Sequence, residues 1–417
     1  MKKVFIAFLS LIVNTVFVIS QPVQLSDAAK ISLLTTSPWS GAIYSVYGHT
    51  AMQVEDDSTG VDAVFNYGYF DQSQPHFMYH FVRGETDYVL GVVPFDQFLP
   101  EYKQKGVEVI KQELNLTPQE KQSLWEGLYI NSLPENRGYR YNYFFDNCST
   151  RPRDMIEKYL NGTVRYPAAA KEQTFRDLLH ECLHYYPWME FGVDLLIGSD
   201  ADKVADVRQK MFLPKYLMEP LRQASVVRND TLPLPLVKNE ITLLSAVNPT
   251  NADSGKNIFH PLGIAFVLLF LTIIISLVQW MPVKSAGLIK IYDTLLFGVF
   301  GIGGLIIFFL LFFSVHPATS PNWNFVWLNI FALIAAVLLW INSMRNVVYV
   351  YHFINFAVLT FFLILWWLIP QQLPVATIPF SMCLWMRSGA NVFMRKKRIR
   401  KNKRFTTSKY MKAGWGQ

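Results

Sequence analysis

The segment Phe144-Phe145-Asp146-Asn147-Cys148-Ser149-Thr150-Arg151 lies where a hydrophobic run gives way to a helix-forming sequence, Arg153 to Leu160. Far upstream, Gly48-His49-Thr50 opens a stretch typical of a strand. A helix N-terminus or a neighbouring imidazole lowers the pKa of a thiol and favours the nucleophilic thiolate. Cys148 and His49 are therefore the candidate nucleophile and base for chemistry that passes through a thioester.

A hairpin around His49 supplies candidate partners for the imidazole. Residues 49–55 and 61–67 have the composition of strands and are joined by a turn cluster at 56–60. Antiparallel pairing places His49 opposite about residue 67, so Asn66 or Tyr67 is its expected neighbour. Asn66 is the better orienting group because its amide oxygen can accept a hydrogen bond from the imidazole N–H.

Residues beside Cys148 are candidates for binding substrate. The backbone N–H of Cys148 and the side chain of Asn147 could donate hydrogen bonds to an oxyanion. Tyr67 is a further candidate for binding the oxyanion or the substrate. Arg151 is expected in a structural ion pair, and the alternative is that it faces a phospholipid phosphate.

The remaining sequence before residue 222 predicts short strands mixed with helices. Strands are expected at 42–47, 86–93 and 107–116, and a capping pattern at Thr117-Pro118-Gln119-Glu120 begins a helix that runs to about residue 131. A further helix is expected over 174–185. Without a βαβ alternation, this pattern indicates an α+β domain over 21–221. Residues 222–257, with several Pro, Asn and Ser, are predicted to be a linker.

The rest of the chain predicts export and membrane insertion. Residues 1–20 fit a signal peptide, and an uncleaved anchor is the alternative. Five apolar segments follow the linker at 258–280, 288–315, 324–344, 348–370 and 374–393. Each approaches the ~20 residues that cross a bilayer. Lys and Arg occur in the first and third links but not in the second and fourth. The positive-inside rule then places the basic tail 394–417 in the cytoplasm and the α+β domain outside.

The charge distribution supports a membrane role for the tail rather than a nucleic-acid partner. The chain has a net charge of +7, and 51% of its 417 residues are hydrophobic. Residues 387–417 contain eleven Lys or Arg and no acidic residue, so the remainder carries −4. The basic character therefore belongs to a segment beside a membrane span, where it is expected to contact anionic lipid.

Two features offer alternatives to a reactive Cys148. In an oxidising compartment Cys148 could form a disulfide with Cys182, which would make it inert. The segment His180-Glu181-Cys182-Leu183-His184 matches the H-E-x-x-H pattern of zinc hydrolases, with a solvated helix face as the other interpretation. Candidate third ligands for a zinc ion, none at a distinctive spacing, are Glu190, Asp194 and Asp200.

The loop between the second and third apolar segments is polar and aromatic, with the sequence His316-Pro317-Ala318-Thr319-Ser320-Pro321-Asn322-Trp323-Asn324. His316 and Asn322 are candidates for gripping a lipid headgroup or a substrate terminus. The alternative is an interfacial cap with an aromatic belt residue.

Five motifs follow one another along the chain: Tyr47-Gly48-His49-Thr50-Ala51, Phe65-Asn66-Tyr67-Gly68, Phe81-Val82-Arg83-Gly84, Tyr141 to Arg151, and Phe191 to Gly198. Together they resemble the Lnb family of bacterial lipoprotein N-acyltransferases. The resemblance covers nearly the whole mature chain. It implies an exported domain that is a circularly permuted relative of NlpC-type, papain-like enzymes with His before Cys, followed by an all-α membrane domain of five helices.

The resemblance also implies a location and an activity. The protein is expected in the bacterial inner membrane with its catalytic domain in the periplasm. Cys148 would take an acyl chain from the lipoprotein's own sn-2 ester or from a phospholipid, and pass it to the α-amino group of a lipoprotein N-terminal cysteine. No cofactor or metal is implied. Alternatives are a cell-wall amidase or peptidase of the NlpC type using the same dyad, or a zinc metallopeptidase.

Overall fold

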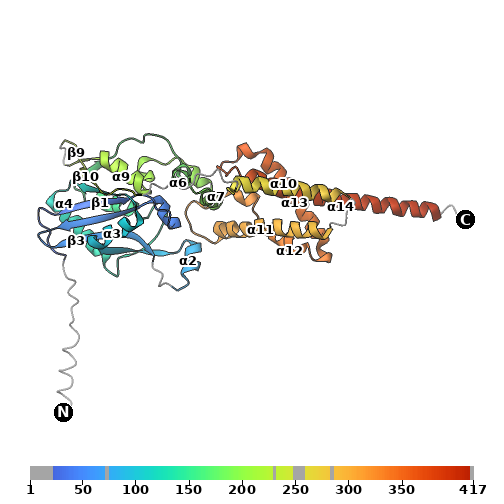
Figure 1. Cartoon of the computed structure of the whole chain (residues 1–417), viewed down its shortest axis with the longest axis horizontal. Helices are drawn as coiled ribbons and strands as arrows, with labels where there is room; N and C mark the ends of the chain where they lie inside the picture. The colour runs from blue at the N-terminus through green and yellow to red at the C-terminus, as the bar shows by residue number, and fades with distance from the viewer. Residues whose placement is uncertain (1–21, 71–74, 229–231, 248–258, 282–285, 414–417) are drawn as a thin grey trace, which may run out of the picture.

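The computed structural model describes residues 22–70, 75–228, 232–247, 259–281 and 286–413, so the predicted signal peptide lies outside the described residues. An α+β domain occupies one end of an elongated molecule, and a set of long helices occupies the other (Figure 1). The two parts meet at α7 (Pro187–Leu196) and α2 (Phe77–Arg83) (Figure 1).

One antiparallel sheet of seven strands organises the α+β domain, in the order β10-β5-β1-β2-β3-β4-β6. The strands are β1 (Lys30–Thr36), β2 (His49–Asp56), β3 (Val61–Phe70), β4 (Asp87–Pro94), β5 (Val109–Leu114), β6 (Gly138–Arg140) and β10 (Val237–Leu244). A small sheet joins β7 (Thr163–Arg165), β8 (Ser225–Val227) and β9 (Leu234–Pro235).

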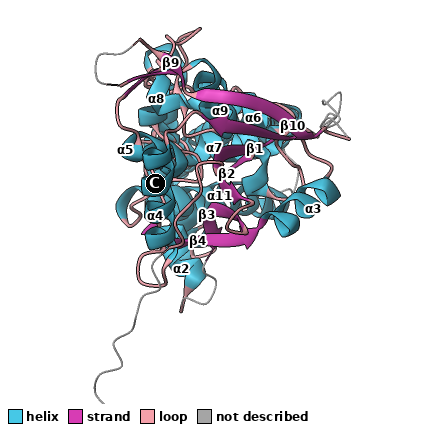
Figure 2. Cartoon of the chain, turned by 90° about the vertical axis from the view of Figure 1, so that its left-hand side faces the viewer, coloured by secondary structure: helices cyan, strands magenta, loops and turns pink. Residues whose placement is uncertain are grey.

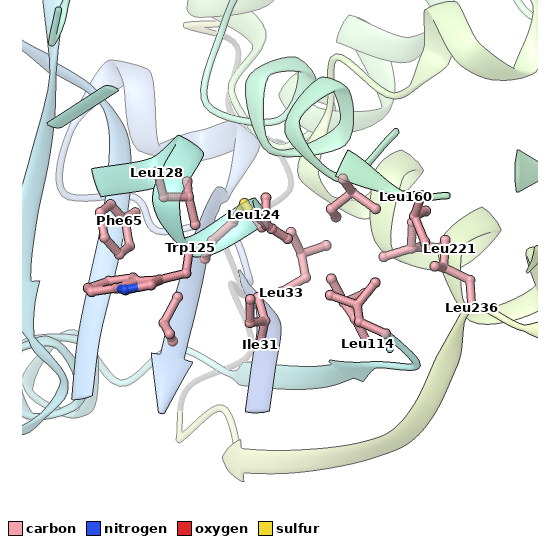
Figure 3. Packing of buried hydrophobic residues seen from close by; sticks show 14 of the residues in the cluster. Ile31, Leu33, Phe65, Leu114, Leu124, Trp125, Leu128, Leu160, Leu221 and Leu236 are labelled. Atoms are coloured by element: carbon pink, nitrogen blue, oxygen red, sulfur yellow. The ribbon is translucent and has the colours of Figure 1, made fainter. Parts of the chain in front are cut away.

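Helices cover both faces of the large sheet (Figure 2). Besides α2 and α7, the helices of this domain are α3 (Phe95–Lys105), α4 (Pro118–Ser132), α5 (Thr150–Tyr159), α6 (Phe175–Leu183), α8 (Val207–Lys210) and α9 (Pro214–Gln223), with 3₁₀ turns η1 (Ile43–Tyr47) and η2 (Ser199–Asp202). Trp125 and Leu128 of α4 pack with Ile31 and Leu33 of β1 on one face (Figure 3). Leu34 of the same strand packs on the other face, in a cluster with Phe98 of α3. Because side chains alternate along a strand, β1 is buried on both sides.

The hairpin and the helices predicted over 118–131 and 174–185 are confirmed as β2–β3, α4 and α6, and Thr117 and Thr174 form capping boxes. The strand predicted over 42–47 is wrong, since this segment is the 3₁₀ turn η1. The linker predicted over 222–257 is also wrong in its described part. β8, β9 and β10 lie there, and β10 pairs with β5 at the edge of the large sheet.

Each of the five predicted apolar segments coincides with helical structure. The long helices are α10 (Pro261–Trp280), α11 (Ala286–Phe312), α13 (Arg345–Ile364) and α14 (Thr377–Ala413). Among the described residues, the helices over 261–280, 286–312 and 342–364 are long and apolar enough to cross a membrane. The third predicted segment is instead broken into η3 (Trp323–Val326) and the nine-residue α12 (Ile330–Leu338). At 1.5 Å per residue, α12 alone is shorter than the ~30 Å hydrocarbon core.

Arg387, the charged residue inside the fifth predicted segment, is neutralised by a carboxylate of α11. Its Nε donates to Asp293 Oδ1 at 2.6 Å and its Nη2 donates to Oδ2 at 3.0 Å, with both side chains buried. Ser276 of α10 accepts from Nη1, and Asn391 donates to the same carboxylate. The pair links three helices and allows an arginine at this depth.

Removing one member of this pair should destabilise the helical domain strongly. Arg387→Met leaves Asp293 buried without a counter-charge, so we expect a loss of about 3–5 kcal/mol in the free energy of unfolding. The double variant Arg387→Met/Asp293→Leu leaves no unpaired charge and should recover most of the melting temperature in detergent. A single variant that melts no lower than the double variant would contradict this.

Candidate active site

Gly48 sets where β2 begins and therefore where His49 lies. Its φ is +80°, and a Cβ at this position would lie 2.6 Å from the carbonyl oxygen of Thr36. Thr36 is the residue that pairs with His49 across β1 and β2. Glycine alone tolerates both the positive φ and the close approach. The chain can thus leave η1 and place His49 at the first position of β2.

Asn66 on β3 holds the imidazole of His49, as the hairpin predicts. His49 Nε2 and Asn66 Oδ1 are 3.2 Å apart, and Asn66 Nδ2 donates to the carbonyl of Val64 at 3.3 Å. Because the Nδ2 group is used in this way, Oδ1 is the atom presented to the ring, and Nε2 must carry the hydrogen. The lone pair of the neutral ring is then on Nδ1, which is the atom free to act as a base.

The turn that carries Cys148 is built around Asn147. Asn147 Oδ1 accepts hydrogen bonds from the backbone N–H groups of Ser149 and Thr150 at the start of α5. Its Nδ2 donates to the carbonyls of Tyr143 at 2.7 Å and Phe212 at 2.8 Å. The predicted role of Asn147 as an oxyanion donor is therefore corrected. Both of its amide hydrogens hold the turn, and none is left for a substrate.

The Cys148 turn is attached directly to β2. Thr50 Oγ1 and Ser149 Oγ lie 3.1 Å apart, and the backbone N–H of Thr50 hydrogen-bonds to the Cys148 thiol. Gly68 of β3 (φ +101°) lies against the other side, where an added Cβ would be 3.7 Å from the Cβ of Cys148. These contacts fix the cysteine next to the residue that follows His49.

His49, Asn66, Tyr67 and Cys148 line one cavity of about 220 Å³. Much of its wall is aromatic, and α3 contributes a charged pair, Glu101 and Lys105, whose contacts were not expected from the sequence. The aromatic lining residues include Trp39, Tyr44, Tyr69, Phe70, Tyr88, Tyr102 and Tyr141. Predominantly apolar walls with a few polar groups are typical of small-molecule sites. A partly apolar ligand therefore suits this cavity.

Both candidate catalytic groups are uncharged in this environment. Burial lowers the pKa of His49 to about 4, although the hydrogen bond that His49 donates to Asn66 acts in the opposite direction. Burial raises the pKa of the Cys148 thiol, and hydrogen bonds from Thr50 and Ser149 offset only part of this. The expectation that the helix N-terminus keeps Cys148 as a thiolate is therefore wrong for the free protein. A neutral thiol beside a neutral imidazole calls for proton transfer during attack.

Two family models match the chain. Residues 23–181 match the Lnb N-terminal periplasmic domain, and residues 253–399 match the Lnb transmembrane domain, a five-helix family model. The chain belongs to the Lnb family. Searches found no match to it among curated proteins or among solved structures. Membership makes it an inner-membrane protein with a periplasmic N-terminal domain, and fits a membrane-bound enzyme that modifies lipoproteins.

Arg151 and the hydroxyl of Tyr67 have structural partners in this Lnb protein. Arg151 forms two hydrogen bonds to Asp146, of 2.5 and 2.9 Å, and its guanidinium lies 3.7 Å from the ring centroid of Tyr139. This is the ion pair that the sequence suggested, rather than a phosphate-binding arginine. Tyr67 lines the cavity with its ring while its hydroxyl donates to Asn131 Oδ1 at 2.7 Å.

His316 and Asn322 lie outside the cavity and fasten the Lnb transmembrane domain to the periplasmic domain. His316 Nε2 donates to the carbonyl of Phe81 at 2.8 Å. Asn322 Nδ2 donates to the carbonyls of Leu195 and Leu196 at the end of α7. Their predicted role in binding substrate is corrected accordingly. Contacts with residues more than a hundred positions away in the chain cannot be deduced from a loop's composition.

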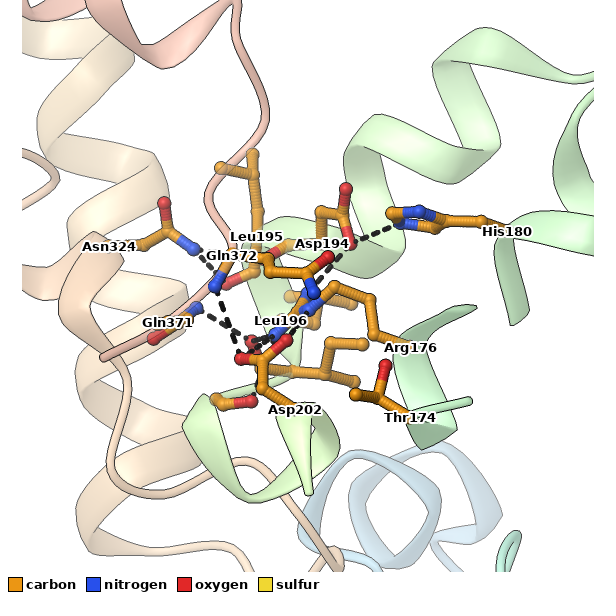
Figure 4. A network of polar contacts seen from close by, with 12 residues as sticks. Thr174, Arg176, His180, Asp194, Leu195, Leu196, Asp202, Asn324, Gln371 and Gln372 are labelled. Atoms are coloured by element: carbon orange, nitrogen blue, oxygen red, sulfur yellow. Dashed lines mark hydrogen bonds and ion pairs between the residues drawn. The ribbon is translucent and has the colours of Figure 1, made fainter. Parts of the chain in front are cut away.

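A buried charge network continues this junction (Figure 4). Arg176 of α6 donates to Asp194 Oδ1 at 2.7 Å and to Asp202 Oδ1 at 2.6 Å. Asn324 donates to the backbone carbonyl of Asp194, and Gln371 donates to a carbonyl just after α7. The salt bridges of Arg176 thus hold α7 and the residues just after it in place. The loops between the membrane helices bind to this same segment.

The H-E-x-x-H segment takes part in this local structure. His180 Nε2 lies 2.9 Å from Asp194 Oδ1. Burial alone would lower the pKa of His180, but this hydrogen bond and the charge of Asp194 raise it. Glu181 accepts from Tyr216 and Gln173. Over the part of the chain that the structure describes, no group of three His, Cys, Asp or Glu side chains is arranged to hold a metal.

The alternative of a disulfide is not realised in this structure, because Cys148 and Cys182 are both free thiols. Cys182 packs in a cluster with Phe144 and Leu179, whereas Cys148 packs against the cluster that contains Tyr67 and Tyr139.

Proposed function

We propose that this protein transfers an acyl chain from a membrane lipid ester to the α-amino group of a lipoprotein N-terminal cysteine, through a thioester on Cys148. The observation that carries the proposal is the shared cavity of His49, Asn66 and Cys148, beside a transmembrane domain. The donor is an sn-2 acyl ester of the lipoprotein itself or a phospholipid, and the acceptor amine lies at the same membrane surface.

In the first half-reaction the thiol proton moves to His49 Nδ1 as Cys148 Sγ attacks the ester carbonyl. The C–O bond then breaks, and the imidazolium returns the proton to the leaving alcohol oxygen, which gives a lysolipid. Asn66 accepts from Nε2–H throughout and stabilises the transient imidazolium. The backbone N–H of Cys148 is the proposed oxyanion donor.

In the second half-reaction the free amine attacks the thioester carbonyl while His49 takes up its proton. The C–S bond breaks, an amide forms, and the proton passes from His49 to the thiolate, which restores Cys148 and His49. An amide is more stable than a thioester, so the transfer runs toward the acylated lipoprotein.

The fold we propose for the periplasmic domain is a permuted papain-like one with His before Cys. It is supported by a nucleophile at the start of α5 and a base on β2 that is oriented by an asparagine on β3. We further propose a cleaved signal peptide at 1–20. We also propose a cytoplasmic tail, because the basic residues are concentrated in the C-terminal part of α14, beyond its apolar part.

Trapping of the acyl-enzyme tests this proposal. The full-length protein in phospholipid nanodiscs would be mixed with a diacylated lipoprotein, quenched in acid and digested. We expect a Cys148 peptide with the added mass of one acyl chain that hydroxylamine removes, together with a lipoprotein that has gained an N-terminal acyl group. An N-acylated product formed by protein whose Cys148 is fully alkylated would contradict the mechanism.

A further inference from the structure

Helix α2 (Phe77–Arg83) exposes apolar side chains at the junction of the two domains. None of its residues is buried, and Met78, Tyr79 and Val82 are 68%, 54% and 42% exposed. A group of exposed apolar side chains on one short helix indicates a surface that contacts a membrane, a ligand or another protein in the working protein.

The C-terminal end of α2 is tied to the periplasmic end of α11. The carbonyl of Arg83 accepts from Val315 N at 2.8 Å and from Ser314 Oγ at 3.1 Å. Gly84 (φ +75°) permits this contact, because a Cβ there would lie 2.8 Å from the backbone nitrogen of His316. Figure 1 shows α2 beside the end of α11 that faces the periplasmic domain. These bonds hold α2 beside the end of α11, a helix that is long and apolar enough to cross a membrane.

The N-terminal end of α2 reaches the wall of the cavity. The rings of Phe77 and Phe70 are 6.2 Å apart, and those of Phe70 and Tyr44 are 5.5 Å apart. Phe70 and Tyr44 both line the cavity that contains Cys148. Phe77 also stacks on Phe81 at 6.1 Å. Neighbouring rings therefore run from the cavity to Phe81, whose ring is 6.4 Å from that of His316, just after α11.

Polar and apolar groups along this path are separated as they are in a helix that lies at a membrane surface. His80 and Arg83 both contact Glu85, with Arg83 Nη2 at 2.8 Å from its carboxylate. At and just after the end of α11, the apolar side chains of Phe312, Phe313 and Val315 are exposed, and the backbone of Val315 is bonded to the end of α2. Charged groups at headgroup level and apolar groups toward the hydrocarbon suit such a helix.

The cavity is smaller than a lipid substrate requires. Its volume of about 220 Å³ is below the ~300–1,000 Å³ that encloses a drug-sized ligand. A lipid with two acyl chains can therefore place only its reacting ester region inside. The remainder must lie on an adjoining apolar surface, and the aromatic path along α2 adjoins the cavity directly.

We propose that α2 lies in the periplasmic leaflet and guides an acyl chain of a bilayer lipid ester into the Cys148 cavity. This inference rests on the proposed function. Its occupant is an acyl chain, because the path is lined by rings and ends on the apolar surface of a membrane helix.

Glutamate substitutions on α2 test this inference in the full-length protein in nanodiscs. Met78→Glu/Val82→Glu should reduce acyl transfer from bilayer lipid at least about tenfold, because carboxylates disfavour insertion. Met78→Leu/Val82→Leu should keep normal transfer. Leu234→Glu, an exposed apolar position on β9 far from the membrane helices (Figure 1), should also leave transfer unchanged. Alkylation of Cys148 by a small water-soluble reagent should proceed at the same rate in all of these proteins.

Photo-crosslinking locates the lipid directly. Nanodiscs containing phosphatidylethanolamine with a diazirine on one acyl chain should give adducts on the peptide that carries residues 77–83. Adducts confined to α10–α14 would overturn the role of α2 but not the proposed function. Glutamate variants with normal transfer would do the same. Loss of Cys148 alkylation together with transfer would also overturn it, because the damage would then lie in the cavity. If Cys148→Ala retains acylation, the proposed function itself fails.

Discussion

A Cys148→Ala protein should produce no detectable N-acylated lipoprotein, which corresponds to a loss of at least about 10⁴-fold in the rate of transfer. Cys148 is the thiol of the cavity, and the covalent step has no acceptor without it. The loss should not come from unfolding, because alanine keeps the Cβ that contacts the Gly68 region and the turn is held by Asn147. The measurement is mass spectrometry of lipopeptides after a fixed incubation, with thermal melting as a check on folding.

Cys182→Ala provides the matched control. Cys182 is a second periplasmic cysteine, but it lies outside the cavity lining and packs against Phe144 and Leu179. We expect its replacement to leave the rate within about threefold of normal, since small core truncations usually change stability rather than chemistry. Loss of activity in both variants to the same extent would indicate a required disulfide. Under non-reducing conditions, both thiols of the native protein should accept an alkylating reagent.

The part of the site that local patterns govern could be predicted from the sequence. Strand composition and a turn cluster define the β2–β3 hairpin, so the contact between His49 and Asn66 could be deduced from antiparallel register. Capping residues likewise predicted the starts of α4 and α6. Each of these inferences depends on residues close together in the chain.

Errors arose where a side-chain hydrogen bond, an exposed edge or a distant partner overrides the local pattern. The segment 42–47 has strand-forming residues, but the hydroxyl of Ser45 bonds to the carbonyls of Trp39 and Ala42 and stabilises a 3₁₀ turn instead. The strand β10 was not predicted because it is a mostly exposed edge strand without a clear alternation of apolar and polar residues. Asn147 looked available because its partner Phe212 lies 65 positions away.

The polar loop at 316–324 illustrates why residue type alone misassigns function. Its His and Asn side chains have the chemistry to bind a headgroup, yet both donate to backbone carbonyls of the periplasmic domain. The same bonds have a functional consequence, because they fix the Cys148 cavity relative to the membrane surface. A transferase whose two substrates are both embedded in one leaflet needs such a fixed position.

His49→Ala should lower the rate of acyl transfer by about 10²–10⁴-fold, the usual contribution of a general base. His184→Ala is the matched control, because this exposed histidine of the H-E-x-x-H segment lies outside the cavity lining and should be dispensable. A loss of activity in His184→Ala but not in His49→Ala would instead favour the metallopeptidase interpretation.

The pH dependence of the native protein gives a sharper test of His49. The base works only when neutral, so kcat/KM falls as pH drops through the pKa of the imidazole in the free enzyme. Because burial lowers that pKa from 6.5 to about 4, the acid limb should lie near pH 4, and activity should be level between pH 5 and pH 7.

The hydrogen bond to Asn66 raises the pKa of His49, so Asn66→Ala should shift this limb to still lower pH. The same variant should lose about 10–100-fold in the plateau rate, because the ring is no longer oriented. The measurement is made at pH values where tryptophan fluorescence shows that the protein is folded. An acid limb near pH 6.5 in the native protein would show that the reacting imidazole is not the buried His49 held between β2 and β3.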